Sequence, residues 1–144
     1  MTKYILREMT VKYRGFKKVK TLTVKAPGDI YSWFKSLENE GIEKFLTVYL
    51  NTKNEVISFS ADFSGSICAC TPDIPRILKN ALLQEACGII ILHNHPSGVP
   101  EPSEGDKIFT SALRKGCEAV NIALLDHLVI GLDKFVSFKE QRLI

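Results

Sequence analysis

The spacing of hydrophobic residues alternates along the chain between helical and strand-like periods. The first clear pattern predicts a one-sided helix that ends near Gly41, with its apolar residues three and four positions apart: Ile30, Trp33, Phe34 and Leu37. The Ala-Pro-Gly-Asp sequence at 26–29 breaks the chain before it and offers Asp29 as the N-cap. Upstream, residues 4–13 and 19–25 predict two extended segments, either a hairpin or a pair of arms.

A β-hairpin is predicted next, with strands at 45–50 and 56–63 joined by a turn at 51–54. Apolar and polar residues alternate in the second strand, so they point to opposite faces. We expect the apolar face to belong to the core: Ile57, Phe59, Ala61 and Phe63. The polar face then meets either solvent or a site: Ser58, Ser60 and Asp62.

The rest of the chain mixes both periods. The elements predicted there are, in order, a strand at 67–70, a helix from 71–73 to Gly88, a strand at 89–92, a helix from Asp106 to about Gly116, and strands at 121–125, 128–130 and 135–138. The sequence contains no internal repeat and no low-complexity linker. This order predicts an α/β fold in which helices flank a mixed sheet.

Composition is typical of a single globular domain. The chain has 144 residues, of which 45% are hydrophobic and 24% charged. Its longest aliphatic run, residues 89–92, is too short to span a bilayer, so no membrane partner is expected. Charged residues near the N-terminus give no sign of a secretory signal, and we expect a cytoplasmic location.

The net charge of +3 conceals a basic N-terminal segment. Residues 1–25 contain eight Lys and Arg but a single acid, Glu8, whereas the remaining chain has an excess of acids. Aromatic residues interleaved with cations between Lys12 and Lys20 suit phosphate contact and base stacking, which indicates a nucleic-acid partner. A solvated hairpin with edge-strand lysines explains the same pattern, and we favour that interpretation.

The four cysteines do not form a disulfide framework. Cys87 and Cys117 each lie near the end of an apolar helical pattern and are expected to be buried free thiols. Cys68 and Cys70 have no second Cys/His pair at zinc-finger spacing, so we expect no metal there.

Candidate chemistry is concentrated between Gly88 and Asp106. The apolar strand at 89–92 leads into His93 and His95, and a Pro/Gly-rich loop follows before Asp106. In an extended segment both histidines face the same way, about 6.5 Å apart, and a helix after the loop can direct Asp106 to the same point. Two imidazoles and one carboxylate suit zinc, and three ligands leave the fourth position open for water.

Each part of this stretch also has a structural explanation. Ser103 and Asp106 fit a capping box with Asp in place of the usual Glu. His93 and His95 are also compatible with polar residues at a strand end, and the prolines and glycines with an ordinary loop. The combination of all these features at this spacing favours the metal site.

The spacing His93-x-His95-x7-Ser103-x2-Asp106 resembles the JAMM motif of MPN-type metalloproteases. Within that superfamily, His-Asn-His-Pro-Ser-Gly at 93–98 and Leu-Asp-His-Leu at 125–128 resemble the RadC family, historically described as DNA repair proteins. The resemblance covers about residues 45–144. It implies a cytidine-deaminase-like α/β sandwich, which we place at 28–144. Longer RadC-type proteins carry an N-terminal helix-hairpin-helix module, whereas residues 1–27 of this sequence indicate a basic extended arm or hairpin.

The resemblance also implies site residues and an activity. His93, His95 and Asp106 would be the ligands of Zn²⁺, and Ser103 would hydrogen-bond the zinc-activated water or the developing oxyanion. The implied reaction is hydrolysis of a peptide or isopeptide bond in a peptide or protein substrate. A catalytically inactive metal-binding scaffold and a nucleic-acid module are the alternatives. A nucleobase deaminase is excluded because the chain lacks its H-x-E and P-C-x-x-C motifs. The sequence does not indicate an oligomeric state.

The general base departs from the family pattern. RadC-type proteins typically carry a glutamate just before a Phe-x-Gly, here residues 63–65, and the matching position is Ser60. Asp62 lies on the same polar face and is our candidate for an imperfect substitute, with Glu55 nearby on the opposite face. His127 could line the site or support a ligand, but its apolar neighbours favour a structural role.

Overall fold

A computed structural model describes residues 20–64 and 72–144. Its strands form one five-stranded sheet in the order β2-β1-β3-β4-β5. The strands are β1 (Lys44–Leu50), β2 (Val56–Ser64), β3 (Gly88–Asn94), β4 (Ala123–Gly131) and β5 (Lys134–Ser137). The pair β3–β4 is parallel and the other neighbours are antiparallel, so the sheet is mixed as predicted.

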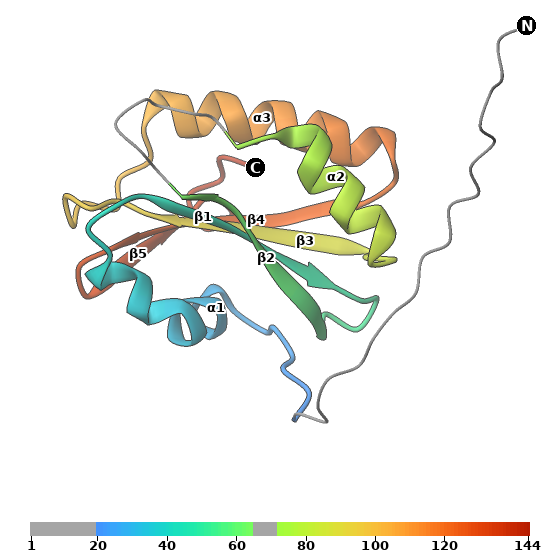
Figure 1. The fold of residues 1–144 in the computed structure, drawn as a ribbon, viewed down its shortest axis with the longest axis horizontal. Helices are drawn as coiled ribbons and strands as arrows, with labels where there is room; N and C mark the ends of the chain where they lie inside the picture. The colour runs from blue at the N-terminus through green and yellow to red at the C-terminus, as the bar shows by residue number, and fades with distance from the viewer. Residues whose placement is uncertain (1–19, 65–71) are drawn as a thin grey trace, which may run out of the picture.

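Helices cover both faces of this sheet. The α-helix α1 (Pro27–Phe34) and the 3₁₀ helix η1 (Lys35–Asn39) lie on one face, and α2 (Ile74–Leu83) and α3 (Glu104–Ala119) lie on the other (Figure 1). The predicted α/β sandwich is therefore confirmed.

Two apolar clusters hold these three layers together. The cluster under α2 and α3 joins residues of β1 and β3 to both helices, among them Phe45, Tyr49, Ile77, Ile89, Ile91, Phe109 and Leu113. The cluster under α1 joins α1 and η1 to the alternate positions of β1 and β3 and to β4, among them Ile30, Leu37, Val48, Leu50, Ile90, Leu92 and Leu128. Because β3 contributes to both clusters, every one of its residues is buried.

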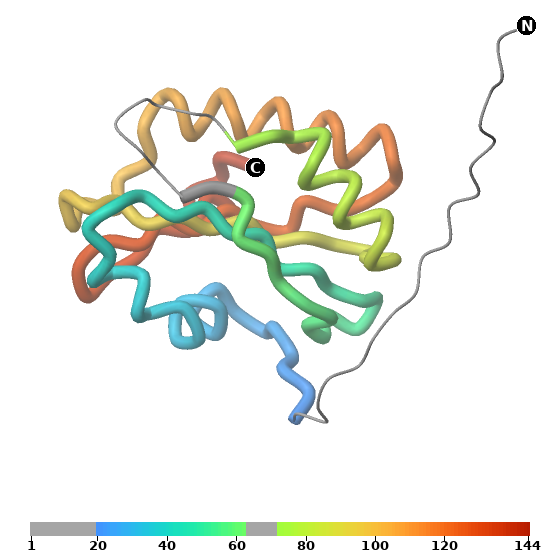
Figure 2. The backbone as a smooth tube through the Cα atoms, in the orientation of Figure 1, coloured from blue at the N-terminus to red at the C-terminus, as the bar shows by residue number. Residues whose placement is uncertain are grey.

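The chain between β3 and β4 brings the candidate residues together. From the end of β3 the backbone turns through a loop, crosses the sheet as α3, and returns as β4 beside β3 (Figure 2). The parallel pairing of β3 and β4 requires such a crossover. It places the start of α3 next to the end of β3.

The first helix differs from its prediction at both ends. It begins at Pro27, with Ala26 at the N-cap, and Asp29 lies inside the first turn. The Asp29 carboxylate accepts hydrogen bonds from the N–H groups of Lys25 and Ala26, at 2.8 and 2.9 Å. Asp29 was predicted as the N-cap residue. It is instead the third residue of the helix, and from there its carboxylate bonds to the backbone at the helix N-terminus. Beyond Phe34 the chain continues as η1 rather than as α-helix.

The predicted core face of β2 is wrong. Ile57 and Phe59 are 42% and 59% exposed. Burial still alternates along residues 57–62, but the apolar positions are the exposed ones, because β2 lies at the edge of the sheet. The polar residues Ser58, Ser60 and Asp62 are instead half-buried.

The C-terminal half contains longer elements than predicted. The strands expected at 121–125 and 128–130 are one continuous strand, β4, which includes Asp126 and His127. Helix α3 passes Gly116 without ending, and this glycine permits close packing, since a Cβ there would lie 2.9 Å from a methyl group of Leu78. Cys117 is buried as expected, whereas Cys87 is exposed because it follows the end of α2.

Several predictions fall on residues outside the described ranges. These are the strands at 4–13 and 67–70, the residues Cys68 and Cys70, and most of the basic segment. Of the extended segment predicted at 19–25, the described part makes an isolated antiparallel bridge from Thr23 to Glu55. Among the described residues, no helix is long and apolar enough to cross a membrane.

Candidate metal centre

His93 is placed by the central strand. It is the next-to-last residue of β3, opposite Phe45 of β1 and Val129 of β4. Its imidazole has no solvent exposure and stacks on the Phe45 ring, with the ring centroids 5.8 Å apart. The ring orientation is therefore fixed by packing on the face that α3 covers.

His95 lies just beyond the end of β3 and is held by β4. Its N–H donates to the carbonyl of Ile130 at 2.9 Å, and its ring Nδ1 is 2.8 Å from the carbonyl of Val99. The loop after β3 packs closely against Gly131, the last residue of β4. A Cβ at this position would lie 2.5 Å from the carbonyl oxygen of Gly98. His95 remains accessible, with a side-chain exposure of 19%.

Asp106 enters from the first turn of α3. Ser103 is the N-cap, and its Oγ accepts from the N–H of Asp106 at 3.1 Å while Asp106 Oδ2 accepts from the N–H of Ser103 at 2.7 Å. The predicted capping box is therefore confirmed. The Asp106 carboxylate also contacts both histidines. Its Oδ1 is 3.3 Å from His93 Nε2, and its Oδ2 is 3.4 Å from His95 Nε2.

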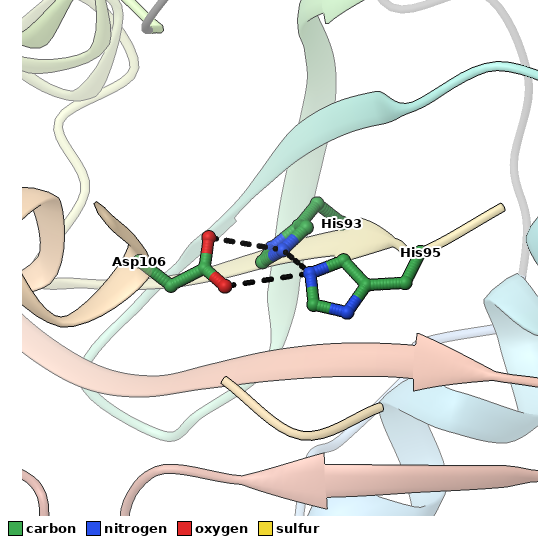
Figure 3. Close-up of side chains that lie close together, drawn as sticks. All are labelled: His93, His95 and Asp106. Carbon is green, nitrogen blue, oxygen red and sulfur yellow. Dashed lines mark hydrogen bonds and ion pairs between the residues drawn. The ribbon is translucent and has the colours of Figure 1, made fainter. Parts of the chain in front are cut away.

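The three predicted ligands converge on one point (Figure 3). Their candidate ligand atoms all lie within 4.8 Å of one another, and the two Nε2 atoms are 3.0 Å apart. Among the described residues, these three are the one group of histidine, cysteine and acidic side chains that could hold a metal ion.

The hydrogen on His95 can be located from its partner. A carbonyl oxygen only accepts hydrogen bonds, so the contact with Val99 requires the hydrogen to be on Nδ1 of His95. In the neutral ring, Nε2 then carries a free electron pair, and this pair points toward His93 and Asp106.

His93 can be assigned in the same way, through a chain of contacts. Thr110 Oγ1 donates its one hydrogen to the backbone carbonyl of Asp106, at 2.6 Å. It must therefore accept a hydrogen from His127 Nδ1, which is also 2.6 Å away. Complete burial lowers the pKa of His127 well below its usual value, so its ring is neutral. Its Nε2 therefore accepts from His93 Nδ1, at 2.8 Å, which leaves His93 Nε2 with a free electron pair.

These assignments leave two imidazole electron pairs and one carboxylate facing each other without a hydrogen between them. Such a group repels itself unless a cation lies within it. In the metal-free protein, a proton on an imidazole Nε2 can supply this positive charge, and the pKa values agree with that. The Asp106 carboxylate raises the pKa of His95. Burial raises the pKa of Asp106, but its hydrogen bonds and charge interactions with both histidines outweigh burial and hold that pKa far below the usual range. Two nitrogens and one oxygen fit Zn²⁺.

His127 is itself held firmly. Its ring stacks on Phe138, with centroids 4.5 Å apart, and its N–H donates to the buried Asp126 carboxylate at 2.7 Å. Asp126 also accepts from the Ser137 hydroxyl at 2.6 Å and from the N–H of Lys139 at 3.0 Å. The structural role that we favoured is thus incomplete, since His127 also contacts a candidate ligand directly.

Glu43, which the sequence reasoning did not consider, also lies at the centre. It precedes β1, and its Oε1 is 3.9 Å from His93 Nε2. Its side chain is 44% exposed, so its carboxylate is open to solvent on the side away from His93. Glu43 lies fifty residues before the histidines, and neither its spacing nor its polar surroundings marked it.

Asp62 belongs to a different group of side chains. Its two carboxylate oxygens accept from the hydroxyls of Thr47 and Ser60. Ser60 is in turn 2.7 Å from the hydroxyl of Tyr49. Asp62 is not part of the ligand group, and burial raises its pKa although the two hydroxyls act against burial. Glu55 lies at the β1–β2 turn, where its Oε2 accepts from the side-chain amide of Asn51 at 2.8 Å.

The match to known proteins covers nearly all the described residues. Residues 24–143 match the family model "RadC-like JAB domain". The chain is 34% identical to a UPF0758 protein of Methanosarcina mazei over 82% of this chain and 52% of that protein. It is 46% identical to one of Geobacillus sp. (strain WCH70) over 69% of this chain and 44% of that protein. The chain thus spans about half the length of these curated relatives. On this evidence, the chain belongs to the RadC-like JAB domain family.

Proposed function

We propose that this domain is a zinc-dependent hydrolase that cleaves a peptide or isopeptide bond. The observation that carries the proposal is the convergence of His93 Nε2, His95 Nε2 and the Asp106 carboxylate, with every ring hydrogen directed elsewhere. The open carboxylate of Glu43, 3.9 Å from one of these atoms, adds a proton acceptor. Three ligands and a nearby base are the components of a catalytic rather than a structural zinc site.

Zinc bound there would lower the pKa of a water to about 7 and polarise the scissile carbonyl. Glu43 is positioned to take the proton from that water and pass it to the leaving nitrogen. We propose Glu43 for this role in place of Asp62, because both oxygens of Asp62 already accept hydroxyl hydrogens.

Ser103 is suited to stabilise the oxyanion. Its Oγ accepts from the N–H of Asp106, and its hydroxyl hydrogen has no acceptor among the residues that the structure describes. The side chain is exposed and adjacent to a ligand, so this hydrogen can be donated to substrate. Support for a peptide or protein substrate comes from the exposure of Ser103 and Glu43, which lets an extended chain reach the centre from outside.

The first test is zinc content by mass spectrometry, followed by cleavage of a proteome-derived peptide library. We expect about one zinc per chain and cleavage that stops when the metal is removed and returns with Zn²⁺. Glu43→Gln should keep the zinc and lose cleavage. Zinc without any cleavage would instead favour the metal-binding scaffold, and protein without zinc after reconstitution would contradict the proposal.

A further inference from the structure

Asn94 separates the two candidate histidine ligands in sequence, but its side chain is used elsewhere. It is completely buried, and its amide contacts the backbone at the start of β1 and just before it. Oδ1 accepts from the N–H of Lys44 at 2.7 Å, and Nδ2 donates to the carbonyl of Ile42 at 3.0 Å. A longer contact, 3.4 Å, reaches the carbonyl of Glu40. The amide therefore satisfies its hydrogen-bonding groups on a single stretch of backbone.

Glu43 is the residue between the two backbone groups that Asn94 holds most closely. Its own side chain is 44% exposed, its Oε1 lies 3.9 Å from His93 Nε2, and its charge also acts on His95. A half-exposed glutamate with so few contacts has many rotamers, so its placement depends on its backbone. That backbone is fixed on either side by the amide of Asn94.

We propose that Asn94 is a positioning residue for Glu43, an inference that rests on the proposed function. Successive residues of a strand point to opposite faces, so β3 presents His93 to the metal centre and Asn94 to the segment that carries Glu43. Two adjacent residues of one strand thus hold the ligand and the backbone that carries the proposed base. An error of about 1 Å in the distance between ligand and base costs about 100-fold in rate, which explains the use of a buried, fully bonded amide.

The test compares Asn94→Ala with a matched control, Asn51→Ala. Asn51 lies at the other end of β1, and its Oδ1 likewise accepts from two backbone N–H groups, those of Lys53 and Glu55, at 2.9 and 3.0 Å. Both substitutions remove an asparagine side chain that hydrogen-bonds to backbone groups. Of the two asparagines, Asn94 bonds to the backbone on either side of Glu43, and Asn51 does not. Asn94→Asp keeps the acceptor for Lys44 and serves if Asn94→Ala does not fold.

Three readouts separate positioning from general stability. In Asn94→Ala we expect zinc affinity, by chelator competition, to stay within about 3-fold, and hydrogen exchange of the Lys44 amide to accelerate by about 10-fold or more. We expect kcat on a peptide that the wild type cleaves to fall by about 10- to 100-fold with KM nearly unchanged. Asn51→Ala should change none of the three, and Asn94→Asp should recover part of the Lys44 protection.

The decisive comparison uses Glu43→Gln as the background. If Asn94 acts through Glu43, adding Asn94→Ala to Glu43→Gln causes little further loss of kcat. Three outcomes would each overturn the positioning role. The losses of kcat from the two substitutions could be fully additive, zinc affinity could fall as much as kcat, or exchange of the Lys44 amide could be unchanged. A wild type that holds no zinc or cleaves no peptide would instead contradict the proposed function, and Lys44 exchange would still report whether Asn94 fixes this segment.

Discussion

Asp62 and Asp106 are two half-buried carboxylates on the side of the sheet that α2 and α3 cover, and their surroundings differ. Asp62 is surrounded by hydroxyl groups, which donate hydrogens to both its oxygens. Asp106 faces the Nε2 atoms of two imidazoles, and the Nδ1 atoms of these rings bond to other partners. The pKa of Asp62 is raised by burial and that of Asp106 is lowered by the histidines in spite of burial.

The comparison shows that burial of an acid does not by itself make a metal site. Hydroxyl groups can donate or accept, so Thr47 and Ser60 complete the hydrogen bonding of Asp62 within the protein. Each neutral imidazole has one donor and one acceptor, and at Asp106 the donors are committed to Val99 and His127. The remaining acceptors face each other across a space that a metal ion or, in the metal-free protein, a proton would satisfy.

The largest effect is expected at the metal itself. Asp106→Asn should reduce zinc affinity by about 100-fold or more, because it removes the one anionic ligand. Asp62→Asn is the matched control and should retain about one zinc per chain. Mass spectrometry with chelator competition measures both, and equal zinc loss in the two variants would eliminate the distinction between the carboxylates.

The next effect concerns the base. Glu43→Gln should lower kcat by about 10²- to 10⁴-fold, the range of general acid–base catalysis, while zinc stays bound. Asp62→Asn should keep kcat within a few-fold. Peptide hydrolysis by zinc-loaded protein is the measurement. The opposite ranking of these two variants would assign the base to Asp62 and not to Glu43.

A smaller effect is expected from the hydrogen-bond chain behind His93. His127→Phe or Thr110→Val should weaken zinc binding by about 10- to 100-fold, because the donor on His93 Nδ1 loses its fixed acceptor. Thr110→Ser keeps the hydroxyl and should bind zinc like the wild type. Ring ¹⁵N shifts should report an Nδ1-protonated His93 in the zinc-loaded wild type. An Nε2-protonated ring would contradict the assigned chain.

The smallest effect is the pH dependence of stability in metal-free protein. The folded pKa of Asp106 is lowered, so its stabilising contribution is present above the unfolded value of about 3.9 and is lost as pH falls through the folded pKa. The folded pKa of Asp62 is raised, so its contribution becomes less favourable as pH rises from about 3.9 through the folded pKa.

Thermal unfolding of Asp62→Asn and Asp106→Asn between about pH 3 and 7 tests these signs. Relative to the wild type, Asp106→Asn should lose more stability at higher pH, and Asp62→Asn should lose less. Slopes of the same sign for both variants would show that the two environments do not differ as described.

Local sequence was sufficient for much of this protein. A four-residue aliphatic run predicted the central strand, and the spacing of His93, His95 and Asp106 predicted that these three side chains come together. These predictions succeed because the ligands lie within fourteen residues, at a strand end and a helix start whose directions are set by local geometry. The capping box at Ser103 succeeds for the same reason.

Long-range pairing decided the rest. Glu43, Thr110 and His127 reach His93 or its hydrogen-bond chain only because β1, α3 and β4 pack around β3, and no short motif encodes those neighbours. The exposed face of β2 was missed because its edge position depends on the order of the strands in the sheet. The sequence by itself thus determined which side chains form a group that could hold a metal ion. The tertiary structure decided which acid stands beside them and which hydrogens point away, because both depend on contacts between distant strands.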